Sequence, residues 1–258
     1  MSIICPLISC ICITRGKPAM LQRVIDCFGA QSYPEKELIV VYEDDDTPTV
    51  QFIENRTYDV AITFICAGTT PKQPLGELRN MGIKKAAGEF VCQWDDDDWY
   101  HSGRLAVQYK ELLVNNRHGS ILTQWVVYDA VRKNAYVSNK RIWEGSILCR
   151  KEVLLLKPYE NKSIGEDTPT IEYLAEENHL QLITDQPGLY IYIYHGHNTW
   201  NAGHWDYIFE CSEQLPEADA ADIVTMLNGT FSPHVGSLLM DEIIHRHHTR
   251  EQAGFIKQ

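Results

Sequence analysis

The stretch EFVCQWDDDD, residues 89–98, decides the fold. Its first six residues are interpreted as a buried strand, and four consecutive aspartates follow where that strand ends. Like charges this close repel one another and cost stability unless a cation or a helix cap compensates. Asp98 or a neighbour could cap a helix that starts after Ser102, but capping explains one aspartate and not four. The run is therefore interpreted as a functional cation site.

The residues before this stretch alternate strand and helix patterns. Strands are predicted at residues 7–13, 37–42 and 60–66, and helices at 19–30 and 76–86, with a short polar helix before the third strand. This alternation predicts an α/β protein with a mostly parallel sheet flanked by helices. Ligands bind beyond the carboxyl ends of such strands. A second acidic cluster, residues 43–46, follows the strand at 37–42 and is expected at the same edge.

The second half of the chain is less regular. Helices are predicted at residues 105–113 and 167–175, and strands at 120–128, 142–149 and 189–194. Residues 206–258 are expected to form a helical extension with an apolar core at 239–244. No repeat or Gly/Ser linker divides the chain, so a second full domain is not expected.

Composition narrows the class of partner. The 258 residues carry 23 Lys plus Arg against 35 Asp plus Glu, a net charge of −12, which argues against nucleic acid. The eight cysteines are scattered without a C-x-x-C pair, which favours a reducing, cytoplasmic compartment. The apolar run at residues 3–13 is too short to span a bilayer and lacks a basic leader, so only peripheral membrane contact is expected.

The aspartate run has the chemistry of a site for Mg²⁺ or Mn²⁺. These cations prefer oxygen ligands and commonly combine one or two carboxylates with phosphate oxygens of a substrate. Asp95 and Asp97 would point the same way if the extended geometry continued past the strand.

Together these features resemble a family 2 glycosyltransferase of the GT-A fold, over roughly residues 5–205. The matching pieces, in order, are residues 13–15 (ITR), 30–41 (AQSYPEKELIVV), 78–83 (LRNMGI), 87–91 (AGEFV), 95–97 (DDD), 165–167 (GED) and 195–200 (HGHNTW). The resemblance implies a catalytic domain at 1–205, with a nucleotide-sugar half at about 1–100 and an acceptor half at about 101–205. Residues 206–258 then form the C-terminal extension.

The resemblance further implies an inverting transferase that uses a nucleotide-diphosphate sugar, with UDP favoured, in polysaccharide biosynthesis. Asp97 would ligate the metal directly, and Asp95 and Asp96 would contact the ribose and metal-bound water. The remaining donor contacts implied are Thr14 and Arg15 at the nucleotide, Glu43 or Asp44 at the base, and Arg79 at the ribose or diphosphate. The acceptor implied is a hydroxyl of a glycan, glycolipid or surface polymer.

An acceptor hydroxyl is a poor nucleophile, so a carboxylate base should remove its proton. Asp167 is the candidate base, with Glu166 supporting it or binding the acceptor. The alternative is that both simply cap the helix that follows, where anions are favoured. Both interpretations can hold together, because a base at a helix N-terminus can also be a cap.

Histidines offer further ligands. His195 and His197 are two apart on an extended segment and share a face, so either could approach the metal or diphosphate, although packed or surface positions are as common. His204 is a weaker candidate of the same kind. The tract formed by His245, His247 and His248 is interpreted as the solvated end of an amphipathic helix.

Trp143 and Glu144 are the candidate acceptor contacts. Trp143 or Trp125 could stack on a sugar ring, and core packing is the equal alternative.

Two other functions remain open from the sequence. One is a nucleotidyltransferase, which would release pyrophosphate instead of a nucleoside diphosphate. Thr14-Arg15-Gly16-Lys17 weakly resembles the phosphate-binding loop of such enzymes. A non-catalytic carbohydrate-binding protein on the same fold would bind donors without turnover.

Overall fold

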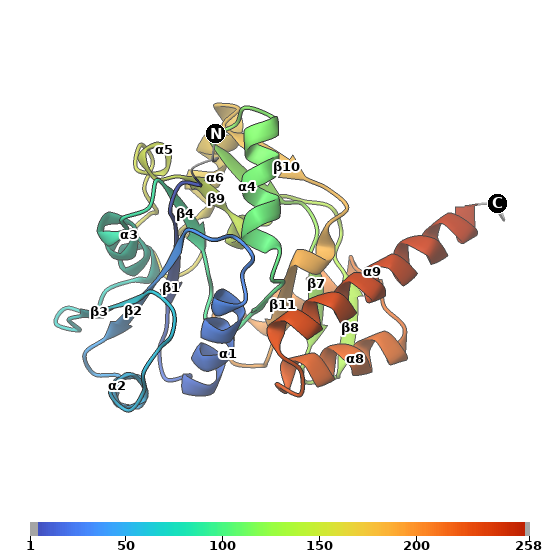
Figure 1. Ribbon diagram of the computed structural model, residues 1–258, viewed down its shortest axis with the longest axis horizontal. Helices are drawn as coiled ribbons and strands as arrows, with labels where there is room; N and C mark the ends of the chain where they lie inside the picture. Colours follow the sequence, from blue (N-terminus) through green and yellow to red (C-terminus); the bar gives the residue numbers. More distant parts are fainter. Residues whose placement is uncertain (1–4, 256–258) are drawn as a thin grey trace.

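The computed structural model describes residues 5–255, and a seven-stranded sheet runs through its centre (Figure 1). The strand order is β10-β6-β9-β4-β1-β2-β3. Their bounds are β1 (Ile8–Ile13), β2 (Lys36–Glu43), β3 (Ile62–Ala67), β4 (Phe90–Gln93), β6 (Gly119–Leu122), β9 (Leu148–Arg150) and β10 (Leu180–Ile183). Every neighbouring pair in this sheet is parallel except the two that β9 makes with β4 and β6. The predicted α/β class with a mostly parallel sheet is confirmed.

Helices cover both faces of this sheet. They are α1 (Pro18–Gly29), α2 (Thr47–Glu54), α3 (Leu75–Lys85), α4 (Arg104–Val114), α5 (Lys151–Leu154) and α6 (Thr168–Glu176). Successive side chains of β1 point to opposite faces, so Cys10 packs in one core cluster with Leu21 of α1. Ile11 packs in the other cluster with Leu78 and Ile83 of α3. Burial on both faces explains why the strands read as continuous apolar runs.

A second, five-stranded sheet with the order β12-β8-β7-β11-β5 adjoins the first. Its strands are β5 (Trp99–Tyr100), β7 (Val126–Asp129), β8 (Asn134–Val137), β11 (Tyr190–Tyr194) and β12 (Glu213–Gln214). The single strand predicted at 120–128 is wrong: β6 belongs to the large sheet and β7 to the small one. The chain changes sheets around Trp125, whose ring stacks on Tyr190 at a centroid distance of 4.2 Å.

The strand predicted at 142–149 is also wrong over most of its length. A 3-10 turn, η1 (Glu144–Ser146), precedes the short β9. The Ser146 hydroxyl donates to the Trp143 carbonyl at 2.7 Å and accepts from the backbone N–H of Leu122 at 2.9 Å. This local side-chain bonding satisfies backbone groups that a strand would have paired.

The C-terminal segment contains α7 (Ala202–Glu210), α8 (Glu217–Leu227) and the long α9 (Pro233–Phe255), whose far end projects from the body (Figure 1). A boundary at residues 205 and 206 falls inside α7. Trp205, Ile223 and Ile243 belong to the same core cluster as the strands. A short 3-10 turn, η2 (Pro187–Leu189), lies under α9, where a Cβ on Gly188 would meet Ile244 at 2.9 Å.

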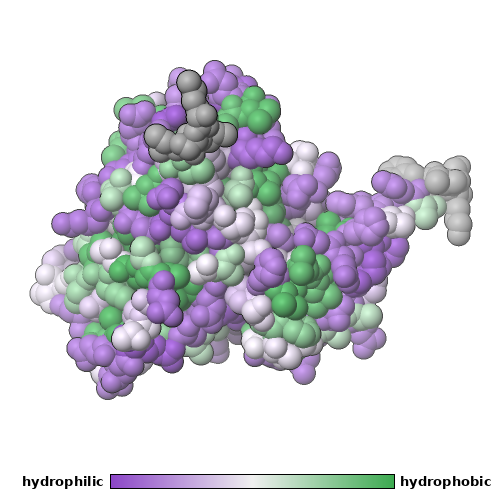
Figure 2. All heavy atoms as spheres, viewed as in Figure 1, coloured by the Kyte–Doolittle hydropathy of each residue, from purple (hydrophilic) through white to green (hydrophobic). Residues whose placement is uncertain are grey.

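Within residues 5–255, no helix has the length and apolar character needed to cross a bilayer. The face seen in Figure 2 is largely hydrophilic, with apolar side chains gathered in separate patches.

Candidate active site

A cavity of about 530 Å³ lies where the two sheets meet, beyond the carboxyl ends of β1 and β4. Parallel sheets bind ligands at this edge, because loops from neighbouring strands converge there. Most of the lining comes from residues 13–17, 93–98, 141–145, 163–168 and 197–204, and Leu75, Arg79, Trp125 and Tyr192 complete it. These segments include most of the candidates singled out from the sequence.

Asp95 is fixed by a buried arginine. The Arg79 guanidinium lies 2.8 Å from Oδ1 of Asp95 and donates to Oε1 of Glu166 at 3.0 Å. Arg79 and Glu166 are both almost fully buried, whereas Asp95 is partly exposed to the cavity. Arg79 therefore joins the aspartate run to the Glu166-Asp167 pair, and one cation offsets two carboxylates that would otherwise repel.

Asp96 turns toward β1. Its Oδ2 accepts a hydrogen bond of 2.8 Å from the Thr14 hydroxyl, and both groups are buried. Burial, together with the negative charge of Asp97, raises the pKa of Asp96 to about 7. Thr14 therefore positions an acidic group that can exchange a proton near neutral pH.

Asp97 carries the concentrated negative charge of the run. Its Oδ2 lies 2.8 Å from Nζ of Lys17 and 3.0 Å from Nε2 of His195. Burial acts to raise the pKa of Asp97, but the hydrogen bond from His195 and the ammonium of Lys17 outweigh it and hold this pKa at about 2. Asp97 is therefore ionised at any physiological pH and already faces a cationic group.

Asp98 plays a structural part. It is fully buried, and its carboxylate accepts from the Tyr190 hydroxyl at 2.5 Å and from the Ile193 N–H at 2.9 Å. The capping alternative considered for Asp98 is wrong, because α4 begins at Arg104 with Gly103 as N-cap and no side-chain cap bond. Asp98 instead anchors β11 to the end of the aspartate run.

Asp167 is the N-cap residue of α6, yet its side chain makes no capping hydrogen bond. Asp167 therefore occupies the capping position of the helix, as the alternative predicted, but its carboxylate does not cap the helix. Burial, reinforced by the charge of Glu166, raises the pKa of Asp167 to about 7, although Arg79 opposes this. A carboxyl group in the cavity wall with this pKa suits general acid–base work near neutral pH.

The acidic cluster after β2 lies beside the cavity and not in its wall. Arg15, which does line the cavity, pairs with the buried Glu43 and forms two hydrogen bonds to Asp45, of 2.6 and 2.9 Å. Asp44 is exposed and accepts from the backbone and hydroxyl of Thr69. Of the two candidates for a nucleobase contact, Glu43 is the one next to Arg15.

The candidate acceptor contacts lie in the part of the cavity lining formed by residues 141–145. Trp143 stacks on Trp125 at a centroid distance of 4.6 Å, and both rings are buried while their edges line the cavity. The two stacked rings therefore pack in the core and also border the cavity. Glu144 lines the same wall, half-buried, and pairs with Arg141 at 3.4 Å.

The histidines divide into three groups. His195 bonds to Asp97, and its Nδ1 accepts from the backbone N–H of His197 at 3.2 Å. His197 and His204 line the cavity. For His247 the interpretation as a solvated helix end is wrong, because it is 3% exposed and α9 continues to Phe255. The sequence pattern missed this because the apolar stripe of α9 ends three residues earlier.

Two residues at the site escaped the sequence analysis. The sequence singled out Lys17 only as part of residues 14–17, which weakly resemble a phosphate-binding loop. In the structure its ammonium contacts both Asp96 and Asp97. Trp200 is 39% exposed, lines the cavity and stacks on His204 at 4.4 Å with an interplanar angle of 17°. An exposed aromatic ring next to a polar cavity is a signal for sugar contact, and Trp200 stood within a motif already quoted.

The cavity suits a divalent cation. Asp97 presents a carboxylate oxygen that already contacts an ammonium, and further hard oxygen donors lie beside it. Asp97, Asp95 and the imidazoles of His195 and His197 are the residues that would hold the ion. Lys17 occupies that position as a cation in the structure described.

A carboxylate-lined cavity beyond the carboxyl ends of parallel strands lies where α/β enzymes of this class bind their ligands. Residues 9–171 match the family model described as glycosyl transferase family 2. The chain therefore belongs to glycosyl transferase family 2, and the resemblance inferred from its motifs is confirmed.

Two relatives resemble the chain in sequence. One is the amylovoran biosynthesis glycosyltransferase AmsB of Erwinia amylovora, 28% identical over 152 residues, which are 58% of this chain and 44% of that protein. The other is the GalNAc(5)-diNAcBac-PP-undecaprenol beta-1,3-glucosyltransferase of Campylobacter jejuni, 24% identical over 153 residues, 59% of this chain and 48% of that protein. The matched region is thus about half the length of each relative.

Solved structures show the same fold. Residues 1–349 of S. aureus TarS in complex with UDP-GlcNAc superpose with a TM-score of 0.60 at 14% identity, covering 94% of this chain and 73% of that one. The mannosyltransferase PcManGT of Pyrobaculum calidifontis, in complex with GDP-Man and Mn²⁺, gives 0.58 at 15% identity, covering 92% and 74%. The chain therefore has the GT-A-like α/β fold of these transferases, with a long C-terminal helix added.

Proposed function

We propose that the protein is an inverting glycosyltransferase that moves a sugar from a nucleoside-diphosphate donor to a hydroxyl of a glycan, glycolipid or surface-polymer acceptor. The observation that carries this proposal is Asp167, whose uncapped carboxyl group lines the same cavity as Asp95, Asp96 and Asp97. A base and a cation-binding run in one cavity are what sugar transfer from a phosphate leaving group requires.

The donor half of the cavity supplies charges for a nucleoside diphosphate. Arg15 and Lys17 are the cations at the mouth, and Glu43 beside Arg15 is the acceptor for a base N–H. The buried Oε1 of Glu43 has no hydrogen-bond partner among the described residues, which leaves it available for such a donor. A divalent cation bound at Asp97 would neutralise the charge that develops on the leaving diphosphate.

Lys17 has a second part to play in this proposal. Its ammonium contacts Asp96 and Asp97, so a metal held by Asp97 would compete with Lys17 for these carboxylates. An ammonium released there stands next to the phosphates of the donor, where a flexible point charge is effective.

Asp167 acts on the acceptor. Its carboxylate takes the proton of the attacking hydroxyl while the hydroxyl oxygen bonds to the anomeric carbon, and the bond from that carbon to the diphosphate oxygen breaks. Attack from the face opposite the leaving group inverts the anomeric centre. Arg79 holds Glu166 beside Asp167, so Glu166 positions the base and keeps its pKa high.

The acceptor half offers aromatic surfaces. Trp200 gives an exposed ring, and Trp143 and Glu144 line the same cavity. These groups suit a sugar ring, with its apolar face and hydroxyl edge. The names of the two relatives, one for amylovoran and one for an undecaprenol-linked glycan, support a surface-polymer or lipid-linked acceptor. UDP is favoured as donor nucleotide, since TarS was solved with UDP-GlcNAc.

The test is turnover of UDP-, GDP-, CDP- and dTDP-sugars with oligosaccharide acceptors, followed by the phosphorus-containing product. Release of a nucleoside diphosphate with an inverted glycoside supports the proposal. Release of pyrophosphate identifies a nucleotidyltransferase instead, and donor binding without turnover on any acceptor identifies a carbohydrate-binding protein.

A further inference from the structure

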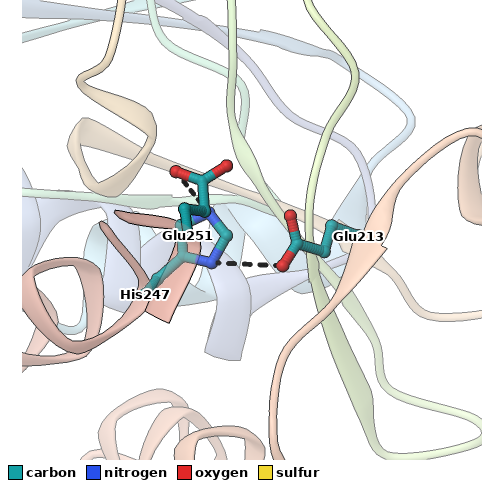
Figure 3. A group of neighbouring side chains, drawn as sticks. All are labelled: Glu213, His247 and Glu251. Carbon is teal, nitrogen blue, oxygen red and sulfur yellow. Dashed lines mark ion pairs between the residues drawn. The ribbon is translucent and has the colours of Figure 1, made fainter. Parts of the chain in front are cut away.

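A second cluster of ligand-type side chains lies far from the cavity, where α9 passes the edge strand β12. Met240, Ile243 and Ile244 form the buried stripe of α9, and His247 continues it one turn later. Glu251 is a further turn along the same stripe, and Glu213 projects from β12 (Figure 3). None of the three residues lines the active-site cavity.

His247 lies between the two carboxylates. Its Nδ1 is 3.7 Å from Oε1 of Glu213, and its Nε2 is 3.8 Å from Oε2 of Glu251 (Figure 3). Ligand atoms of all three residues lie within 4.8 Å of one another. His247 and Glu251 are four residues apart on one helix, the spacing that places two ligands side by side on one face.

The His247 side chain is buried, with 3% of the residue exposed. Each ring nitrogen faces a carboxylate at more than hydrogen-bond distance, Glu213 on one side and Glu251 on the other. Imidazole nitrogen and carboxylate oxygen are both ligands that Zn²⁺ takes, so an ion can bridge groups that do not bond to one another directly.

Among the residues that the structure describes, neither Glu213 nor Glu251 pairs with a lysine or arginine. The neighbouring Arg246 and Arg250 pair with Asp219 instead, at 2.7 and 2.9 Å. Both glutamates are exposed, so their side chains can turn toward a bound ion at little cost.

We propose that Glu213, His247 and Glu251 form a binding site for a divalent cation of the zinc class, which ties α9 to β12. One imidazole nitrogen and two carboxylates, with water in the remaining position, match the ligands that Zn²⁺ takes. Ligands at about 2.0–2.2 Å from a tetrahedral ion lie roughly 3.4 Å apart, close to the His–Glu distances already present. The ion takes one ring nitrogen, and the carboxylate that faces the other nitrogen swings across to it.

The test is Zn²⁺ binding to the full chain in an Asp97→Asn background, so that the active-site cavity contributes least. Competition with a chromogenic chelator should reveal one equivalent of bound Zn²⁺. Glu213→Gln and Glu251→Gln keep shape and exposure, and each should weaken binding by at least about tenfold, the lower end of the loss seen when even an outer partner of a metal ligand is removed. His245→Ala, an exposed histidine on the same helix, is the matched control and should leave affinity unchanged.

A second measurement tests whether the ion links α9 to β12. Zn²⁺ should raise the melting temperature of the parent, and the rise should disappear in Glu213→Gln, because binding to the native state alone stabilises it. The proposal is overturned if no equivalent binds, or if Glu213→Gln binds as tightly as the parent. Weaker Zn²⁺ binding in Glu251→Gln but not in Glu213→Gln also overturns the proposal. In that case His247 and Glu251 of α9 would hold the ion without β12.

Discussion

Two acidic runs follow buried parallel strands of the same sheet, residues 43–46 after β2 and residues 95–98 after β4, yet they serve different ends. In the first run the carboxylates pair with the adjoining loops after β1 and β3 and with the start of α2. Asp46 accepts from the Thr49 N–H at the start of α2 and from the Gly16 N–H, and Asp45 is exposed and pairs with Arg15. Apart from Glu43, the proposed contact of the nucleobase, this run turns the chain and caps a helix.

In the second run each carboxylate depends on residues distant in sequence. Asp95 binds Arg79, Asp96 binds Thr14, and Asp97 binds Lys17 and His195, 80 and 98 residues away. Of the two runs, residues 95–98 line the cavity described above and residues 43–46 do not. The comparison teaches that an acidic strand end becomes a site through the groups that converge on it and not through its own composition.

The largest effect is expected at Asp167, the proposed base. Asp167→Asn removes this proposed proton acceptor and should lower kcat by roughly 10²–10⁴ while donor binding is retained. Steady-state turnover and donor titration measure the two quantities. Glu172→Gln, an exposed carboxylate on the same helix, should behave as wild type. An unchanged kcat in Asp167→Asn would remove Asp167 from the mechanism.

A matched pair of substitutions tests the two runs directly. Asp97→Asn should lower metal-dependent turnover by roughly 10²–10³, because the cation it holds is expected to be worth several kcal/mol to the transition state. Asp45→Asn makes the same chemical change in the other run and should cost no more than about threefold, the range of an exposed ion pair. Equal losses in the two variants would mean that the runs are not different in kind.

The pH profile sharpens the assignment within the second run. The pKa of Asp167 is raised to about 7, and a base works only when deprotonated, so kcat/KM should rise about tenfold per pH unit below 7 and level off above it. Asp96 has a pKa in the same range, so the Asp167→Asn variant decides between them. Its residual activity should lack the acidic limb, and a limb that persists would point to Asp96.

The smallest effect is expected in the first run. Asp46→Ala removes the cap of α2 and should lower the free energy of unfolding by about 1 kcal/mol, measured by denaturant titration. Activity at a temperature where the variant is folded should not change. A catalytic loss comparable to that of Asp97→Asn would show that the first run belongs to the site.

The first hundred residues were predictable because local patterns decide them. Apolar runs covered on both faces, a proline at the start of α1 and the acidic strand ends placed four strands and three helices within a few residues. The same reasoning failed at 120–128 and 142–149, where tertiary contacts override the pattern. Trp125 leaves one sheet for an aromatic stack in another, and Ser146 closes a turn with its own hydroxyl.

The site was predictable in membership and not in pairing. Residue types and order brought Asp95, Asp97 and Asp167 forward, and the structure places all three in one cavity wall. That Arg79 bridges Asp95 to Glu166, or that Lys17 contacts Asp97, depends on side chains brought together from distant segments. Burial of His247 was equally hidden, since it follows from the way α9 packs against the second sheet.

We infer that residues 95–98 bind a nucleoside diphosphate through a divalent cation. Calorimetric titration of the full chain with UDP, GDP, CDP and dTDP, with and without Mn²⁺, tests it most directly. The account predicts tight binding of one nucleotide, UDP, only when Mn²⁺ is present, and loss of that binding in Asp97→Asn. Equal binding without metal, or no binding of any diphosphate, would contradict it.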